Sequence, residues 1–201
     1  MRERRGSTSR NASYDHCFNY FREHFERHRV NDLLNGTQLQ LSCLHLGFYL
    51  ASWGMFRGKA ALLQHSSSAL VPVVELISNA PEVLWTLDVK DYDDESVSEI
   101  LEFKDALAVR VPGGRSEILT SKIMLGVFGC VPAFDRYFRK GSGLSSFRKQ
   151  ALLEIREYYR GNQDVIESCR SNTMDFEGSV LERQYTQAKV VDMIFFIEGN
   201  K

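Results

Sequence analysis

Residues 119–138 read LTSKIMLGVFGCVPAFDRYF, and this stretch decides the fold. Its first half has the apolar spacing of a buried helix and carries a single lysine, Lys122. We expect the helix to stop at Gly129 and a second helix to start at Pro132, which brings Asp135 into an apolar setting. Polar groups in such a setting cost free energy unless they are paired. Each is therefore expected to have a partner, to reach the surface or to serve a function.

Helical spacing of apolar residues also dominates the rest of the chain. The clearest segments are residues 13–34, 37–55, 96–107 and 186–197. There are few β-branched clusters and no Asn-Gly turn between alternating runs, so no strand pair is expected. Residues 180–184 are expected to form a short helix after a polar loop. We predict an all-α fold, with a disordered basic tail over residues 1–12 and a single compact domain of about nine helices over residues 13–201.

The bulk composition is that of a soluble globular protein. The chain has 201 residues, 43% hydrophobic and 25% charged, and its net charge of −1 argues neither for nor against a nucleic-acid partner. Its four cysteines form no Cys-x-x-Cys pair and no secretory signal opens the chain, so we expect a reducing, cytoplasmic environment without disulfides. Residues 33–56 lack Asp, Glu, Lys and Arg. Polar residues interrupt this run, so it predicts a central buried helix and no membrane partner.

Charge is unevenly distributed along the chain. Residues 82–105 hold nine acids and two lysines, and we expect residues 88–95 to form a solvated loop. Residues 135–149 hold five bases and one acid, interleaved with aromatic residues. Arginines can neutralise phosphates and aromatic rings can stack on bases, so this basic stretch is a candidate nucleic-acid surface. The alternative is that its aromatic residues belong to the core and its bases only face solvent.

Lys122, the Gly126-Val-Phe-Gly129 turn, Pro132 and Asp135 together resemble the helix-hairpin-helix DNA glycosylase superfamily. The resemblance covers about twenty residues. It implies that Asp135 orients catalysis at a base flipped out of the duplex, while the usual place of the superfamily's catalytic lysine is not matched in this chain. Phe128 and Cys130 depart from the Pro- and Lys-like residues of that hairpin.

Three weaker patterns accompany this one. Lys189-Val-Val-Asp192 in the final helix is a second lysine–aspartate combination. Residues 47–55 followed by Arg57 resemble uncharacterised bacterial all-helical proteins without a named activity. The run from Arg10 to His16 resembles the arginine–histidine motif of the HEPN ribonucleases.

We place the candidate site where lone charges meet aromatic residues. The candidate catalytic residues are Lys122 and Asp135. The candidate binding residues for a flat anionic ligand are Arg57, Trp53, Arg136, Tyr137, Arg139 and Lys140. The alternative is a buried structural ion-pair network, such as one between Arg57 and Asp135.

No cofactor motif is present, since the chain has no phosphate-binding loop, dinucleotide fingerprint, nucleophile elbow or zinc-ligand set. His24 and His28 lie one helical turn apart, but the arginines around them would repel a metal ion. We therefore expect no cofactor and no metal. The expected function is interaction with nucleic acid or a nucleotide, in the setting of bacterial or phage conflict systems. The alternative is a non-enzymatic module that binds a protein through its acidic or basic face, and whether the protein is an enzyme stays open.

Overall fold

The computed structural model describes residues 6–201, which form ten α-helices, four short 3-10 helices and one small sheet. The α-helices are α1 Ala12–Glu26, α2 Gly36–Ser52, α3 Val71–Ser78, α4 Glu82–Thr86, α5 Asp94–Ala108, α6 Glu117–Val127, α7 Arg136–Ser142, α8 Lys149–Gly161, α9 Gln163–Ser168 and α10 Gln187–Gly199. The 3-10 helices are η1 Val30–Leu34, η2 Ala61–Gln64, η3 Ser67–Leu70 and η4 Val89–Asp91. The strands are β1 Asn172–Met174 and β2 Val180–Gln184, paired antiparallel. The predicted all-α class is confirmed.

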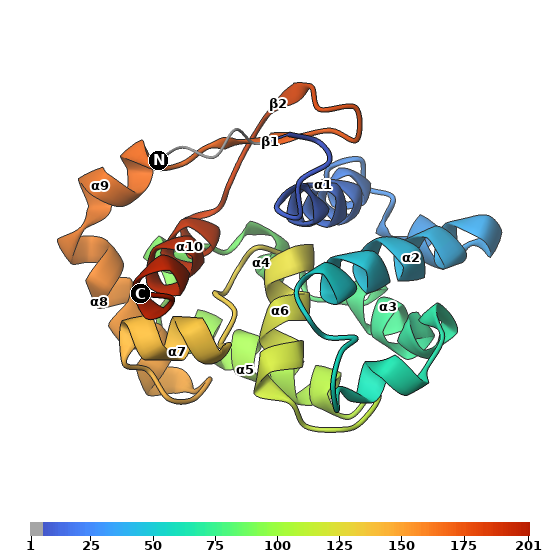
Figure 1. Cartoon of the computed structure of the whole chain (residues 1–201), viewed down its shortest axis with the longest axis horizontal. Helices are drawn as coiled ribbons and strands as arrows, with labels where there is room; N and C mark the ends of the chain where they lie inside the picture. The colour runs from blue at the N-terminus through green and yellow to red at the C-terminus, as the bar shows by residue number, and fades with distance from the viewer. Residues whose placement is uncertain (1–5) are drawn as a thin grey trace.

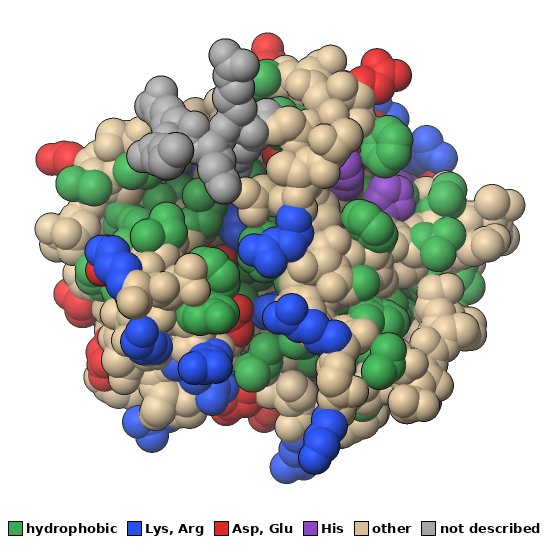
Figure 2. Space-filling view, in the orientation of Figure 1, with side chains coloured by type: hydrophobic (Ala, Val, Ile, Leu, Met, Phe, Trp, Pro, Cys, Tyr) green, Lys and Arg blue, Asp and Glu red, His purple; other side chains and the backbone are tan. Residues whose placement is uncertain are grey.

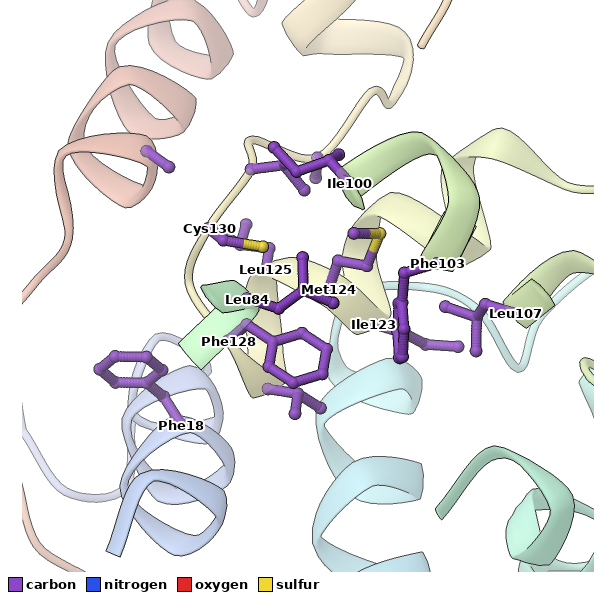
Figure 3. Close-up of a cluster of buried hydrophobic side chains, with 14 of the residues drawn as sticks. Phe18, Leu84, Ile100, Phe103, Leu107, Ile123, Met124, Leu125, Phe128 and Cys130 are labelled. Carbon is purple, nitrogen blue, oxygen red and sulfur yellow. The ribbon is translucent and has the colours of Figure 1, made fainter. Parts of the chain in front are cut away.

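Helix α6 lies at the centre, with α1, α2 and α3 on one side and α7, α8 and α10 on the other (Figure 1). Every residue from Leu119 to Val127 is buried. Figure 3 shows its side chains among those of α1, α4 and α5, with Phe128 at the end of the helix. The Phe128 ring meets Trp85 and Phe103 edge to face, with centroids 4.6 and 5.2 Å apart. Burying an aromatic or aliphatic side chain of this size stabilises the fold by about 1.5–3 kcal/mol before conformational entropy is subtracted.

The chain turns sharply after α6 at Gly129, as expected. Gly129 has φ +68°, a left-handed conformation that favours glycine. A Cβ there would lie 2.7 Å from Thr186 and 2.9 Å from Phe18. The turn therefore brings the chain close to α1 and to the start of α10 at the same point.

The next helix begins after Asp135, not at Pro132 as the sequence suggested. The backbone N–H groups of residues 133 and 134 donate to the side chains of Asp192 (3.0 Å) and Ser121 (2.9 Å), respectively. These bonds hold the segment outside a helix, because side chains of α10 and α6 satisfy the backbone groups. Asp135 then caps α7 through bonds to the first N–H groups of that helix.

Helices α7 and α10 approach so closely that only glycine fits at two positions. A Cβ on Gly141 would lie 2.1 Å from the carbonyl oxygen of Phe195, and one on Gly199 would lie 1.9 Å from that of Tyr137. Gly141 therefore lies inside α7 and allows the close packing. The helix ends at Ser142 and is followed by Gly143, which has φ +75°.

Helix α2 differs from the prediction of a central buried helix. Its inner face, with Leu46 and Leu50, is buried. Its outer face exposes Leu41, Leu44 and Phe48. The absence of charged residues in this segment had suggested burial on all sides, and it does not distinguish a core helix from one with an apolar exposed face. None of the helices within residues 6–201 is long and apolar enough to cross a membrane.

Residues 180–184 form strand β2, so the predicted short helix is wrong. The hairpin is held by polar groups of α1: Asp15 accepts a bond from the N–H of Met174 at 3.1 Å, and Asn19 donates to the carbonyl of Met174 at 2.9 Å. Gly178 (φ +96°) forms the turn between the strands. The strands are thus stabilised by contacts that lie far away in sequence.

Two other segments were predicted to lack regular structure. Of the predicted disordered tail, residues 1–5 lie outside the described residues, while residues 6–11 form turns that lead into α1. In the acidic segment 88–95, Asp88 accepts bonds from the N–H groups of Gln187 (2.7 Å) and Ala188 (2.9 Å). Asp88 therefore caps α10, and the segment is not simply a solvated loop.

Candidate functional site

Lys122 and Asp135 lie side by side, as the sequence predicted. The Lys122 amino group lies 3.3 Å from Oδ2 of Asp135 and donates to the carbonyl oxygen of Trp53 at 2.7 Å. The other oxygen of Asp135 accepts bonds from the N–H groups of Tyr137 and Phe138. Burial lowers the pKa of Lys122, and the charge of Asp135 opposes this effect.

A second buried pair lies on α10. The Lys189 amino group lies 3.2 Å from Oδ2 of Asp192, and it also lies 4.6 Å from the ring centre of Tyr14 and 5.2 Å from that of Trp53. Burial raises the pKa of Asp192. The charge of Lys189 opposes this increase, and the charge of Asp135 adds to it. Both pairs border one small internal cavity, so the four charges form a single cluster.

An open pocket of about 250 Å³ lies next to this cluster. Its lining combines cations, one carboxylate and aromatic rings: Arg10, Asn11, Trp53, Tyr185, Lys189, Asp192, Met193, Phe196 and Ile197. The guanidinium carbon of Arg10 lies 4.8 Å from the ring centre of Trp53. The indole nitrogen of Trp53 is buried and has no hydrogen-bond acceptor within the described part of the chain. The pocket therefore presents a flat ligand with aromatic rings, the Arg10 guanidinium and the paired charges of Lys189 and Asp192.

Positive charge surrounds this pocket. Figure 2 shows Lys and Arg side chains over α7 and over the segment that follows α2, with hydrophobic and acidic surface between them. Arg57, Arg136 and Lys140 are exposed, and none of the three forms an ion pair with another residue between 6 and 201. The partner of Asp135 is Lys122 and not Arg57, so the ion pair suggested as an alternative in the sequence is not formed.

The remaining members of the basic stretch have other contacts. Arg139 donates to the carbonyl of Phe134 and to the carboxylate of Glu117, both at 2.8 Å, and so ties α7 to α6. Tyr137 is half-buried with its ring 5.0 Å from that of Phe196. Three phenylalanines are buried in the core, namely Phe138 and Phe147 of this stretch and Phe134 directly before it. These three rings cannot stack on bases, which leaves Trp53 and Tyr137 as the aromatic candidates.

The structure thus brings together Lys122, Asp135 and Trp53. Sequence reasoning did not place Arg10 in the site, because it assigned this residue to a disordered tail. Lys189 and Asp192 are three residues apart in a helix, so the sequence indicated that they could form an ion pair. Their spacing alone did not show that this side of the helix borders a pocket. Within residues 6–201 no group of three or more His, Cys, Asp or Glu side chains could hold a metal ion.

No protein-family model, curated protein or solved structure matches the chain.

Proposed function

We propose that the protein binds nucleic acid or a nucleotide, with a flat base in the pocket beside Trp53 and phosphate groups at the surrounding cations. The observation that carries this proposal is the pocket, where an indole ring, a guanidinium over that ring and the buried Lys189–Asp192 pair meet, next to the Lys122–Asp135 pair.

The polar groups of the pocket match the edge of a base. Bases present both donors and acceptors, and the Lys189 amino group and the Asp192 carboxylate both belong to residues that line the pocket. Arg10 lies over the indole ring of Trp53. A base could stack on this ring in place of the guanidinium, and such stacking contributes about 1–3 kcal/mol to binding. A volume of about 250 Å³ lies below the ~300–1,000 Å³ of sites for drug-sized ligands, which favours a single ring system.

The cations around the pocket supply the expected phosphate contacts. Arg57 follows α2, whose C-cap is Trp53, and Arg136 and Lys140 lie on α7, which packs against the pocket helix α10. Exposed bases without a carboxylate partner are the side chains that can neutralise a phosphate and release its counterions. A chain of net charge −1 would bind nucleic acid only through such a local concentration of positive charge.

The resemblance to the glycosylase superfamily supports the same class of ligand, because the aspartate that it matches with Asp135 acts at a flipped-out base. Phe128 and Cys130, where the chain departs from that pattern, are buried in the core. We therefore propose binding and assign no base excision. The roles of Lys122 and Asp135 in catalysis stay a prediction.

Fluorescence anisotropy tests this proposal, with labelled single-stranded DNA, single-stranded RNA and duplex DNA across a salt series. We expect affinity for at least one of them to fall as salt rises and to be lost in Arg136→Ala, with unchanged helicity by circular dichroism. The matched control is Arg27→Ala, an exposed arginine at the end of α1 opposite the pocket, which should bind like wild type.

The proposal fails if none of these nucleic acids and no mononucleotide binds at low salt. That result would favour the alternative of a protein-interaction module that uses the acidic or basic face. Binding that Arg27→Ala weakens as much as Arg136→Ala would also contradict it, because the contacts would then be spread over the whole surface.

A further inference from the structure

Helix α2 exposes an uncharged face along its whole length. Leu41, Leu44 and Phe48 have 40%, 45% and 67% of their surface exposed. Thr37 and Ala51 continue the line at its two ends and are exposed too. Single exposed apolar residues are ordinary, but a continuous line of them marks an interaction surface.

These five residues have the spacing of a coiled-coil seam. The steps from residue 37 to 41, 44, 48 and 51 are four, three, four and three, the a and d positions of a heptad. The helix has 17 residues, so the seam extends about 25 Å. Figure 2 shows the surface over α2 as hydrophobic and uncharged polar.

The positions beside the seam carry no Asp, Glu, Lys or Arg, since the whole segment 33–56 lacks them. In coiled coils the charges at these e and g positions select one partner over another and set the orientation. Gln38, Gln40, His45, Gly47 and Ser52 occupy them here. A helix that lies on a membrane surface carries Lys or Arg along its polar flanks, and α2 has none.

We propose that this face of α2 packs against the same face of a second copy of the chain, which makes the protein a homodimer. A two-fold interface must be complementary to itself, and a neutral apolar seam meets its own copy without like-charge repulsion. No charge beside the seam would select a different chain instead. A single helix pair is a small interface, so dissociation is expected at micromolar concentration.

Sedimentation or light scattering between about 5 and 200 μM tests the proposal directly. The mass of the wild type should rise from 23.1 kDa towards twice that value as concentration increases. Phe48→Glu should stay monomeric throughout, because dimerisation would bury two like charges. The matched control is Val109→Glu, 69% exposed in the segment after α5, which should dimerise like wild type. A wild type that stays at 23.1 kDa, or a Phe48→Glu variant that dimerises normally, would overturn the proposal.

Disulfide trapping gives a second test that introduces no charge. Cys17, Cys43 and Cys130 are buried, so a Cys169→Ser background leaves no exposed thiol within residues 6–201. Leu44→Cys in this background should form a covalent dimer under mild oxidation, because residue 44 lies at the middle of the seam. Val109→Cys in the same background should not. Equal yields for the two variants would mean that the dimers arise from random collision.

Discussion

The amino group of Lys122 lies 3.3 Å from the carboxylate of Asp135, and this contact joins the central helix to the start of α7. Both side chains are largely withdrawn from water, so removal of one partner leaves the other charge buried and unpaired. We expect Lys122→Met to lower the free energy of unfolding by about 3–5 kcal/mol.

A double-mutant cycle with Asp135→Asn measures the coupling, since asparagine can still cap α7. We expect a coupling energy of about 1–3 kcal/mol from urea unfolding. The matched control is the exposed pair Lys149–Asp94 at 3.0 Å, for which the same substitutions should give below about 1 kcal/mol. Equal coupling in the two pairs would show that burial adds nothing to the contact between Lys122 and Asp135.

The close approach of α7 and α10 predicts that Gly141→Ala is strongly destabilising. The new methyl group would lie 2.1 Å from a backbone carbonyl, so the two helices must separate. We expect a loss of about 3 kcal/mol or more in urea unfolding, at the upper end for an overpacked core. Gly161→Ala at the end of α8 is the control, because its Cβ would meet nothing within 4 Å. That substitution should be neutral or stabilising by up to about 1 kcal/mol.

The features that sequence reasoning predicted correctly are local ones. Apolar spacing is a property of neighbouring residues, and it identified α1 and α5 because their inward apolar residues recur every three or four positions. The free energy of burying a lone charge predicted that Lys122 and Asp135 would need partners if buried, but the pair suggested from the sequence was Arg57 with Asp135, and the structure pairs Asp135 with Lys122 instead.

The features that the sequence did not predict are determined by contacts between residues far apart in the chain. Strand β2 has no strong strand pattern, and its hairpin depends on Asp15, whose bond to the N–H of Met174 joins residues 159 positions apart. Arg10 reaches the pocket because the turns before α1 bring it to Trp53. The outer face of α2 shows the same limit, since uncharged residues occur both in cores and in interfaces.

Burial of His45 predicts that stability falls as the solution becomes acidic. Burial, with His16 and His24 nearby, lowers the pKa of His45 to about 4, and its ring stacks on Tyr20 at 4.1 Å. The unfolded chain takes up this proton near pH 6.5 and the folded chain only near pH 4, so stability is lost as pH falls between these values. Because the ring is partly exposed, we expect a loss of about 1–2 kcal/mol from this group.

Urea unfolding at pH 4.5 and at pH 7 in His45→Gln measures this contribution. The variant should lose about 1–2 kcal/mol less than wild type between the two pH values. His65→Gln, at an exposed position outside this cluster, should lose as much as wild type. A His45→Gln variant with the wild-type pH dependence would assign the acid sensitivity to other groups.

The contributions of base contacts and phosphate contacts to affinity should be distinguishable by measuring binding across a salt series. Each exposed cation that contacts a phosphate contributes about 0.9 to the slope of log affinity against log salt on duplex DNA. Arg57→Ala and Lys140→Ala should each reduce the slope by about that amount. Trp53→Leu should weaken binding by about 1–3 kcal/mol with little change in slope, because stacking releases no counterions. If Trp53→Leu changes the slope and the cation variants do not, the assignment of base to pocket and phosphate to rim is wrong.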